Sequence, residues 1–315
     1  MRWHGPVELA RMSAAYSGFP HTDGLEGLRL VHCVGAEAAD FLQGQLTQDM
    51  REASAGKTLL AACNTAQGRV IAVLRLRQTG TDVWALVAAD VAEALVAHLK
   101  RYVLRAKVSI DIDHGASITG RRSDGEATDN HTSRAGLDDG AIAFQWAHGR
   151  EVIVRPSSLE AQAGPPDEPR KQTTKALHGN DDIWNSWLAA DIAAGLPHVT
   201  ASTSAHFVAQ MLNLDLLDAI SFSKGCYTGQ EIVARTQNLG RIKRRMLRYR
   251  VATGEPPAPL SALNHQHAKV GEVLQAAAGV AGTELLAVVG LDARDVVLTL
   301  GDGREATPLT LPYAV

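Results

Sequence analysis

The sequence of 315 residues has few cysteines and no long apolar run. Its three cysteines, Cys33, Cys63 and Cys226, lie far apart and form no Cys-x-x-Cys pair. This spacing argues against a disulfide framework and against a self-contained zinc or iron–sulfur site. No apolar run approaches the roughly 20 residues needed to cross a bilayer, and residues 1–6 lack the apolar core of a signal peptide. We therefore expect a protein of the reducing cytoplasm that is neither exported nor embedded in a membrane.

The chain also lacks a large excess of charge of either sign. Its formal net charge is −3 and its pI is about 6.5, so the overall field gives no support for direct nucleic-acid binding. A hydrophobic content of 45% with 21% charged residues is typical of a globular protein. At this length the chain can form two or three domains with a large buried core.

Motifs of several well-known active sites are missing. Residues 56–58 read Gly-Lys-Thr, like the end of a phosphate-binding P-loop, but Arg51 stands where that motif needs a glycine. The sequence has no Gly-x-Ser-x-Gly elbow, which weakens a serine-hydrolase interpretation. His265 and His267 have no cysteine or carboxylate close by, so we interpret them as part of a surface loop. Because Arg51 interrupts the P-loop pattern, we do not expect the chain to bind nucleoside triphosphates.

The hydrophobic periodicity of the first half mixes strands and helices. Strand-like alternation covers residues 28–34, 59–63, 70–77, 83–88 and 103–112. Turn residues between the second, third and fourth of these runs predict an antiparallel meander. Helical spacing covers residues 35–45 and 91–102, with Asp90 expected as the N-cap of the second helix. Helices packed on such strands predict an α+β architecture rather than a doubly wound sheet.

The middle of the chain contains two polar stretches. Residues 123–139 are rich in Ser, Asp, Gly and Thr and predict an exposed loop. Residues 161–182 combine prolines with many polar residues, and we interpret them as a mobile linker. A hairpin is expected over residues 141–155, and helical periodicity returns over residues 183–194. Residues 1–22 are expected to be a loose lead-in.

The C-terminal part has the pattern of a small all-β unit. Apolar runs broken by Gly and Asp occur at residues 270–274, 285–289, 296–298 and 308–311. Together with alternation over residues 242–250 they predict a small β-barrel. Residues 241–250 are also rich in arginine, which suits an RNA-binding patch or the solvated face of a strand. We favour the solvated strand.

The residues with the most chemical potential are 224–231, Lys-Gly-Cys-Tyr-Thr-Gly-Gln-Glu. Cys226 lies among glycines that permit close approach of another backbone or a ligand. Lys224, or the N-terminus of a helix expected near Gln230, can favour its thiolate. A lone cysteine is more often an ordinary buried thiol, so the reactive interpretation depends on these neighbours. The apolar run over residues 212–222 is expected to be a strand or a helix end that leads into this turn.

This octapeptide resembles the Lys-Gly-Cys-Tyr-x-Gly-Gln-Glu motif of the YgfZ family, folate-binding proteins related to the glycine-cleavage T-protein, an aminomethyltransferase. Further similar stretches are residues 40–49, 62–76, 102–108, 187–197 and 207–215. The resemblance implies a ring of three domains around a central cavity that binds tetrahydrofolate or a derivative. It implies a folate-binding α+β core over residues 20–112 and 198–240. A second α+β domain, which includes the linker, would cover residues 113–197, and a C-terminal β-barrel would cover residues 241–315.

The resemblance also implies roles for particular side chains. Cys226 would be the reactive group, with Lys224 beside it. Trp187 would stack on the pterin or the aminobenzoyl group of the folate, although a core tryptophan on an amphipathic helix fits its sequence context almost as well. The other implied ligand contacts are Gln45, Asp49, Gln230 and Glu231. For Gln45 and Asp49 a polar, capped helix end is the alternative.

Departures from the T-protein pattern bear on mechanism. The corresponding T-protein segment resembles Lys-Gly-Asp-Phe-Ile-Gly-Arg-Glu and has no cysteine. Ala94 and Leu95 stand in the neighbourhood of the T-protein's catalytic aspartate, and Ala193 replaces an acidic residue. Without a carboxylate to assist nucleophilic attack, we do not expect classical aminomethyl transfer.

YgfZ-like proteins are associated with assembly or repair of iron–sulfur clusters and, through cluster enzymes, with tRNA modification. The resemblance therefore implies a folate-binding accessory factor whose partners are iron–sulfur proteins or their assembly machinery. The alternative is a folate-dependent one-carbon transferase that moves an aminomethyl or methyl group.

Overall fold

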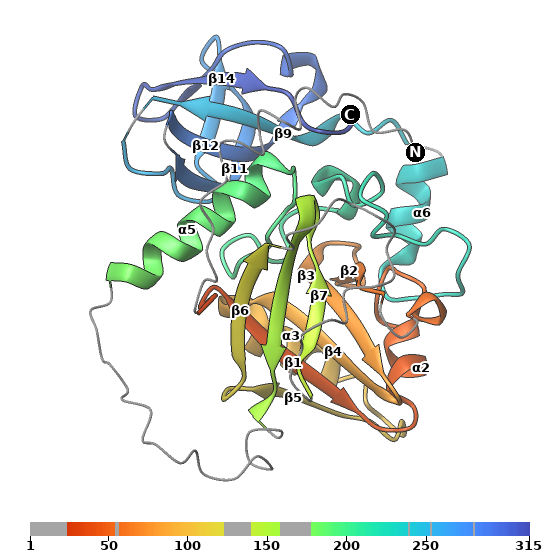
Figure 1. Cartoon of the computed structure of the whole chain (residues 1–315). Coiled ribbons are helices and arrows are strands. Elements are labelled where there is room, and N and C mark those ends of the chain that lie inside the picture. Colours follow the sequence, from red (N-terminus) through yellow and green to blue (C-terminus); the bar gives the residue numbers. More distant parts are fainter. Residues whose placement is uncertain are drawn as a thin grey trace.

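The computed structural model describes residues 24–53, 57–122, 140–157, 178–238, 240–252, 254–279 and 281–315. The predicted lead-in, the predicted loop over residues 123–139 and most of the predicted linker lie outside these ranges. The described chain forms a five-stranded sheet, a three-stranded sheet and a closed six-stranded barrel, together with a few helices (Figure 1). This is the predicted α+β class. None of the described helices combines the length and the apolar character needed to span a membrane.

The five-stranded sheet has the order β2-β3-β4-β1-β5, and all its strand pairs are antiparallel. Its strands are β1 (Leu28–Val34), β2 (Leu59–Asn64), β3 (Val70–Thr79), β4 (Asp82–Ala88) and β5 (Ser109–Asp113). The predicted meander β2-β3-β4 is confirmed. Residues 103–108, predicted as the start of the last strand, are instead irregular, because backbone bonds from Val103 to Lys100 and from Val108 to Ala106 turn the chain locally.

One face of this sheet carries α2 (Ala38–Gln43) and α3 (Ala92–Lys100) over a shared hydrophobic core. The prediction that Asp90 caps α3 is wrong. Asp90 lies in a short 3-10 turn, η2 (Ala89–Val91), and its carboxylate accepts the backbone N–H of Ala201 at 3.0 Å. The carboxylate that was expected to cap the helix is therefore bonded to a distant part of the chain instead.

The three-stranded sheet covers the other face of the five-stranded sheet (Figure 1). It has the order β6-β8-β7, with β6 (Ser117–Arg122), β7 (Ile142–Gln145) and β8 (Arg150–Arg155). The predicted hairpin of β7 and β8 is confirmed. Strand β6 was not predicted, since Ile118 is its only large apolar residue and gives no alternation.

The barrel closes in the order β10-β11-β12-β9-β14-β13, as predicted for the C-terminal part. Its strands are β9 (Arg244–Val251), β10 (Ala262–His265), β11 (Ala268–Gly279), β12 (Gly282–Gly290), β13 (Leu298–Leu300) and β14 (Glu305–Leu309). Helix α5 (His178–Ala193) packs against β11 and lies between the barrel and the sheets (Figure 1). Because α5 begins at His178, the linker prediction is wrong for residues 178–182.

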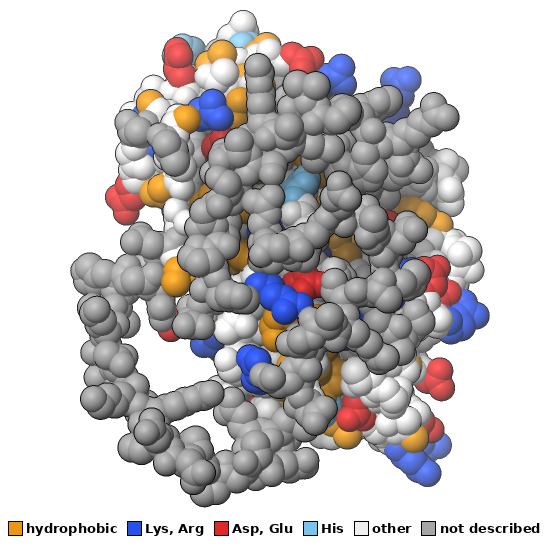
Figure 2. All heavy atoms as spheres, viewed as in Figure 1, with side chains coloured by type: hydrophobic (Ala, Val, Ile, Leu, Met, Phe, Trp, Pro, Cys, Tyr) orange, Lys and Arg blue, Asp and Glu red, His pale blue; other side chains and the backbone are white. Residues whose placement is uncertain are grey.

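Most arginines of β9 are paired rather than solvated, so the expected solvated basic face is wrong. Arg248 and Arg250 donate to Glu284 of the neighbouring strand at 2.6 and 2.8 Å, and Arg245 pairs with Asp215 at 2.7 Å. On the face shown in Figure 2, the coloured Lys and Arg side chains are interspersed with Asp and Glu. Local pairing therefore cancels much of the positive charge that the sequence shows.

The segment before the octapeptide is irregular, so the predicted strand or helix end over residues 212–222 is wrong. A 3-10 turn, η4 (Ala209–Leu212), ends at Asn213, which adopts the left-handed conformation with φ of 58°. Turns that follow place the apolar side chains in a core under the barrel: Leu212, Leu214, Ala219 and Ile220. Helix α6 (Gln230–Asn238) then begins where a helix was expected.

Candidate functional site

Two segments far apart in the sequence, residues 43–51 and 218–231, meet beside the end of β2. Thr47 is buried between them, and its hydroxyl donates to the Ala219 carbonyl at 2.6 Å while it accepts the Ala62 N–H at 2.8 Å. The Ser221 N–H donates to the Thr47 carbonyl at 3.0 Å. These bonds fasten the octapeptide segment to the edge of the five-stranded sheet.

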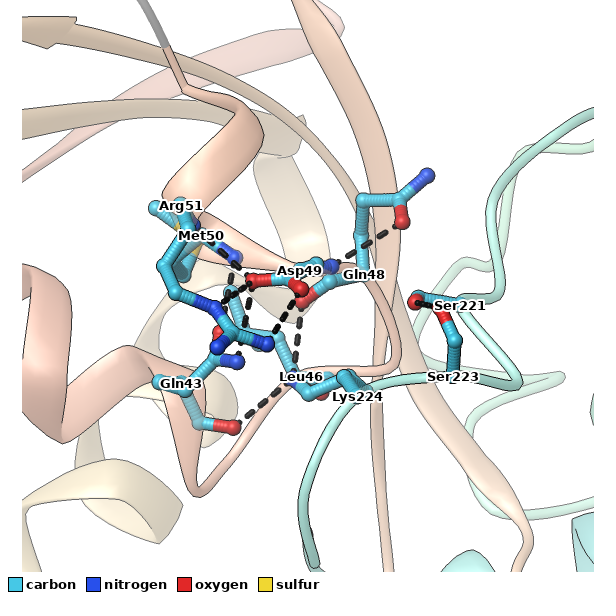
Figure 3. A network of polar contacts seen from close by, with 9 residues as sticks. All are labelled: Gln43, Leu46, Gln48, Asp49, Met50, Arg51, Ser221, Ser223 and Lys224. Atoms are coloured by element: carbon cyan, nitrogen blue, oxygen red, sulfur yellow. Dashed lines mark hydrogen bonds and ion pairs between the residues drawn. The ribbon is translucent and has the colours of Figure 1, made fainter.

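Lys224 is the strongest link between the two segments. Its side chain points into the loop of residues 43–48, and its ammonium donates to the carbonyl oxygens of Gln43, Leu46 and Gln48 at 2.7, 2.8 and 2.8 Å (Figure 3). The residue is only 5% exposed, and burial lowers the pKa of its amine to about 8. An ammonium has three N–H donors, and all of them are used here. No donor of Lys224 is left for Cys226, so the proposed activation of the thiol by this residue has no support in the geometry.

Asp49 lies in the same network (Figure 3). Its Oδ1 accepts from the side chains of Gln43 at 3.0 Å and Arg51 at 2.9 Å, and its Oδ2 accepts from Arg51 at 2.7 Å. The hydrogen bonds from Arg51 hold the pKa of Asp49 well below its ordinary value. Asp49 also caps the 3-10 turn η1 (Met50–Glu52) by accepting the Arg51 N–H. The carboxylate is thus ionised and engaged in the role of a polar cap, and its contact with a ligand remains a prediction.

Gln45 and Thr228 form a further link between the segments. The Thr228 hydroxyl lies 3.2 Å from Gln45 Oε1, and the Thr228 N–H donates to the Gly44 carbonyl at 3.1 Å. Gln45 therefore holds the octapeptide loop in place. Whether its remaining amide donors bind a ligand remains a prediction.

Cys226 is exposed at the outer part of this loop. A Cβ atom added to the neighbouring Gly225 would meet no atom within 4 Å, so the backbone beside the thiol is open. Gly229 is tightly placed, since its φ is 82° and an added Cβ would lie 2.5 Å from the Thr65 carbonyl oxygen. Only glycine fits there. The loop is therefore anchored at Lys224 and over residues 227–229, and it is exposed at Gly225 and Cys226.

The other two thiols are buried. Burial raises the pKa of Cys33 and of Cys63 to about 12, so neither supplies a thiolate at neutral pH. Both side chains therefore belong to the hydrophobic core. Among the three cysteines, Cys226 alone is accessible.

The two predicted contacts that follow the loop belong to α6. Gln230 is its first residue and donates its N–H to the Tyr227 carbonyl at 3.1 Å. Glu231 lies in the first turn with 79% of its side chain exposed, and it pairs with Arg235 at 2.9 Å. Both side chains flank the loop, and their contact with a ligand remains a prediction.

Trp187 lies in a different part of the molecule. It is 1% exposed in the core between α5 and the two sheets, and its ring centroid lies 5.6 Å from that of Trp146. The guanidinium carbon of Arg150 lies 4.5 Å from its ring centroid. This arrangement fits the alternative that Trp187 is a core residue, because Arg150 covers a face of the indole on which a conjugated ligand ring would have to stack. The structure does not bring Trp187 into the network around Lys224.

Asn64 is a buried polar residue that the sequence analysis missed. It ends β2 and is fully buried, yet neither its Nδ2 nor its Oδ1 has a hydrogen-bond partner within the described ranges. A Cβ added to Gly229 would lie 3.0 Å from Asn64 Cβ, so the amide sits beside the Cys226 loop. In the sequence Asn64 reads only as the first residue of a turn.

A buried ionic cluster around Asp191 of α5 was also missed. Its Oδ1 accepts from Trp146 at 2.7 Å and from Arg150 at 2.6 Å, and its Oδ2 bonds with His198 at 2.7 Å. Burial by itself would raise the pKa of Asp191, but the charge of Arg150 and the hydrogen bond with His198 hold it well below its ordinary value. The members come from β8, α5 and the turns around them, so no sequence motif announces the cluster.

The side chains placed by the structure form no metal-binding group of their own. In the described ranges, no three His, Cys, Asp or Glu side chains are arranged to hold a metal ion. Cys226 therefore offers a single thiol to a reaction partner.

Comparison with known proteins establishes the fold. No family model matches the chain. Its structure is similar to the crystal structure of the glycine cleavage system aminomethyltransferase T from Bartonella henselae, with a TM-score of 0.65 over 93% of this chain and 86% of that one. The two sequences are 14% identical. At this identity the similarity shows a shared α+β fold, and the reaction of the relative does not follow from it.

Proposed function

We propose that this chain is a cytoplasmic folate-binding accessory factor of the YgfZ type, which supports assembly or repair of iron–sulfur proteins through Cys226. The observation that carries the proposal is the contrast among the thiols. Cys226 is exposed on a loop anchored at both ends, whereas Cys33 and Cys63 are buried. The resemblance of the octapeptide to the YgfZ motif supports the same function.

An accessible thiol on an anchored loop can act in three ways. It can accept a sulfur atom, form a mixed disulfide with a client, or supply one ligand to an iron that a client also binds. The other ligands of a cluster would come from that client, since Cys226 is a single thiol. Iron–sulfur proteins or their assembly machinery are therefore the partners that we propose, and an effect on tRNA modification would follow through cluster enzymes.

The proposed cofactor is tetrahydrofolate or a derivative. The fold shared with an aminomethyltransferase supports a folate-related function. A folate offers conjugated rings and carboxylates, and the described chain has side chains that fit both. The half-buried indole of Trp184 suits a ring, and the guanidinium of Arg75 suits a carboxylate. When bound, the folate would supply one-carbon chemistry, while these residues would orient it.

The decisive test is the replacement Cys226→Ser in cells that lack the protein. We expect the variant to fold and to bind tetrahydrofolate like the parent, but not to restore the activity of a cluster-containing enzyme. Cys63→Ala is the matched control, since it also removes a thiol and leaves Cys226 intact. Full restoration by Cys226→Ser would show that the sulfur has no essential role.

A one-carbon transferase is the alternative, and the shared fold is compatible with it as well. The helix that would carry a catalytic carboxylate offers Ala94 and Leu95 at that point, and Leu95 is fully buried in the core. The purified chain should therefore leave methylene-tetrahydrofolate unchanged. Steady turnover of that compound by the parent protein alone would establish the transferase instead.

A further inference from the structure

Arg75 is a cation without an acceptor in the interior of the molecule. It lies on the inner strand β3, on the face turned toward the three-stranded sheet, and is half-buried. Its guanidinium carbon lies 3.6 Å from the ring centroid of Trp146. Within the described ranges it makes no hydrogen bond and no ion pair. A guanidinium has only donors, so all of its N–H groups lack a protein acceptor.

The neighbouring carboxylate is not that acceptor. Asp191 accepts from Trp146, Arg150 and His198, and no hydrogen bond or ion pair joins it to Arg75. The pKa of Arg75 is lowered to about 10, mainly by burial, with the charge of Asp191 opposing the shift and that of Arg150 adding to it. The fold thus keeps a cation in a half-buried place where no side chain or carbonyl of the described chain accepts its N–H groups, and such a charge is costly.

A second donor in the same cluster is also without an acceptor. Trp187 Nε1 is completely buried and has no hydrogen-bond partner within the described ranges. Its ring packs edge-on against Trp146, the same indole on which Arg75 stacks. Within the described residues the cluster therefore offers two unpaired donor groups, and its carboxylate is bonded to other side chains. A ligand that complements these donors must carry hydrogen-bond acceptors.

We propose that Arg75, with Trp187 beside it, forms a subsite for a carboxylate of a ligand that also carries an aromatic ring. A planar carboxylate matches the fork of a guanidinium and can accept two of its N–H groups. The half-buried indole of Trp184 supplies apolar surface for the ring. The subsite deepens the proposed folate function and rests on it for the natural ligand, since it directs the carboxylate end of the folate toward Arg75.

The test uses p-aminobenzoyl-glutamate, which has a benzene ring and carboxylates but no pterin, alongside tetrahydrofolate and the uncharged p-aminobenzamide. Binding to the full chain is followed by calorimetry and by tryptophan fluorescence. We expect p-aminobenzoyl-glutamate to bind at least about tenfold more tightly than p-aminobenzamide. Arg75→Met should weaken both carboxylate ligands at least about tenfold, and Arg75→Lys should weaken them less. Arg29→Met, in strand β1 of the same sheet, is the matched control and should bind like the parent.

Melting of the unliganded variants separates a ligand site from a structural contact. Removing an uncompensated charge should leave the melting temperature of Arg75→Met equal to that of the parent or higher. A fall as large as that of Arg150→Met would make the stacking of Arg75 on Trp146 structural and would overturn the inference.

The ligands also separate this inference from the folate proposal. If tetrahydrofolate binds the parent and Arg75→Met equally, the subsite is wrong and the folate proposal stands. If p-aminobenzoyl-glutamate binds through Arg75 while tetrahydrofolate does not bind, the subsite stands and the folate proposal fails. If neither compound binds the parent, both are wrong.

Discussion

Lys224 and Arg75 are two enclosed cations that the fold treats in opposite ways. The ammonium of Lys224 donates to three backbone carbonyls and so closes its own surroundings. The guanidinium of Arg75 stacks on an indole and reaches no acceptor in the described chain. Since a buried donor that stays unpaired costs stability, we assign the fully paired Lys224 to the scaffold and the unpaired Arg75 to the proposed ligand subsite. The comparison thus assigns different duties to two residues that look alike as isolated basic positions in the sequence.

The largest effect is expected when the carboxylate of the Arg75 cluster is neutralised. Asp191→Asn removes the negative charge that faces the buried Arg150, and we expect the free energy of unfolding to fall by about 4 kcal/mol. Urea denaturation at neutral pH measures it. Asp111→Asn is the matched control, because Asp111 is 65% exposed and its pair with Lys100 should contribute less than about 1 kcal/mol. Equal losses in the two variants would contradict the compensation that we assign to Asp191.

The same variant carries a prediction about pH. The pKa of Asp191 in the folded chain lies below its ordinary value of 3.8, so its contribution to stability is complete above that value and is lost as the pH falls below it. Asp191→Asn should therefore lose less stability than the parent between about pH 4 and pH 2. An unchanged acid slope in the variant would mean that other carboxylates dominate the titration.

A smaller loss is expected when Lys224 is replaced. Lys224→Met leaves three carbonyls of the 43–48 loop without their donor, and we expect the free energy of unfolding to fall by about 3 kcal/mol. Lys57→Met is the matched control, because Lys57 is 43% exposed and pairs only with Glu52 at the surface. If both variants are as stable as the parent, the contacts of Lys224 with the carbonyls contribute nothing to the free energy of unfolding. The contrast between Lys224 and Arg75 would then be wrong.

The smallest effect is expected at Cys226. Because Lys224 holds the loop through the backbone of residues 43–48, Cys226→Ser should change the free energy of unfolding by less than about 0.5 kcal/mol. Cys63→Ser places a hydroxyl in an apolar core and should cost about 2 kcal/mol. Alkylation at neutral pH should label Cys226 before either buried thiol. Labelling of Cys63 at a similar rate would contradict its burial.

Local patterns in the sequence were sufficient for the strands and for the barrel. The alternation of residues 28–34, 59–63, 70–77 and 83–88 predicted β1 to β4. Successive side chains of a strand point to opposite faces of the sheet, so the burial of each face is visible in the local sequence. The failures lie where a distant residue decides. Asp90 has the chemistry of an N-cap, but Ala201 takes its carboxylate.

The site shows the same limit. Sequence proximity suggested that Lys224 acts on Cys226, two residues away, whereas its acceptors come from residues 43–48 at the other end of the chain. Arg75 occupies an alternating position of a correctly predicted strand, but the sequence does not reveal that Trp146 and Asp191 meet it there. Which partner a charge finds is a property of the tertiary fold, and local periodicity does not encode it.

The contacts of Lys224 also bear on when the site comes into being. Its acceptors precede it in the sequence by 176 to 181 residues. Thr47 and Ala219, which are joined by a hydrogen bond, are 172 residues apart. Contacts between such distant residues form late, because the intervening chain must be made and folded first. During synthesis the N-terminal sheet can therefore fold while its 43–48 loop still lacks a partner. The thiol of Cys226 is presented on its anchored loop only in chains that have passed this step, so incomplete chains do not carry the site.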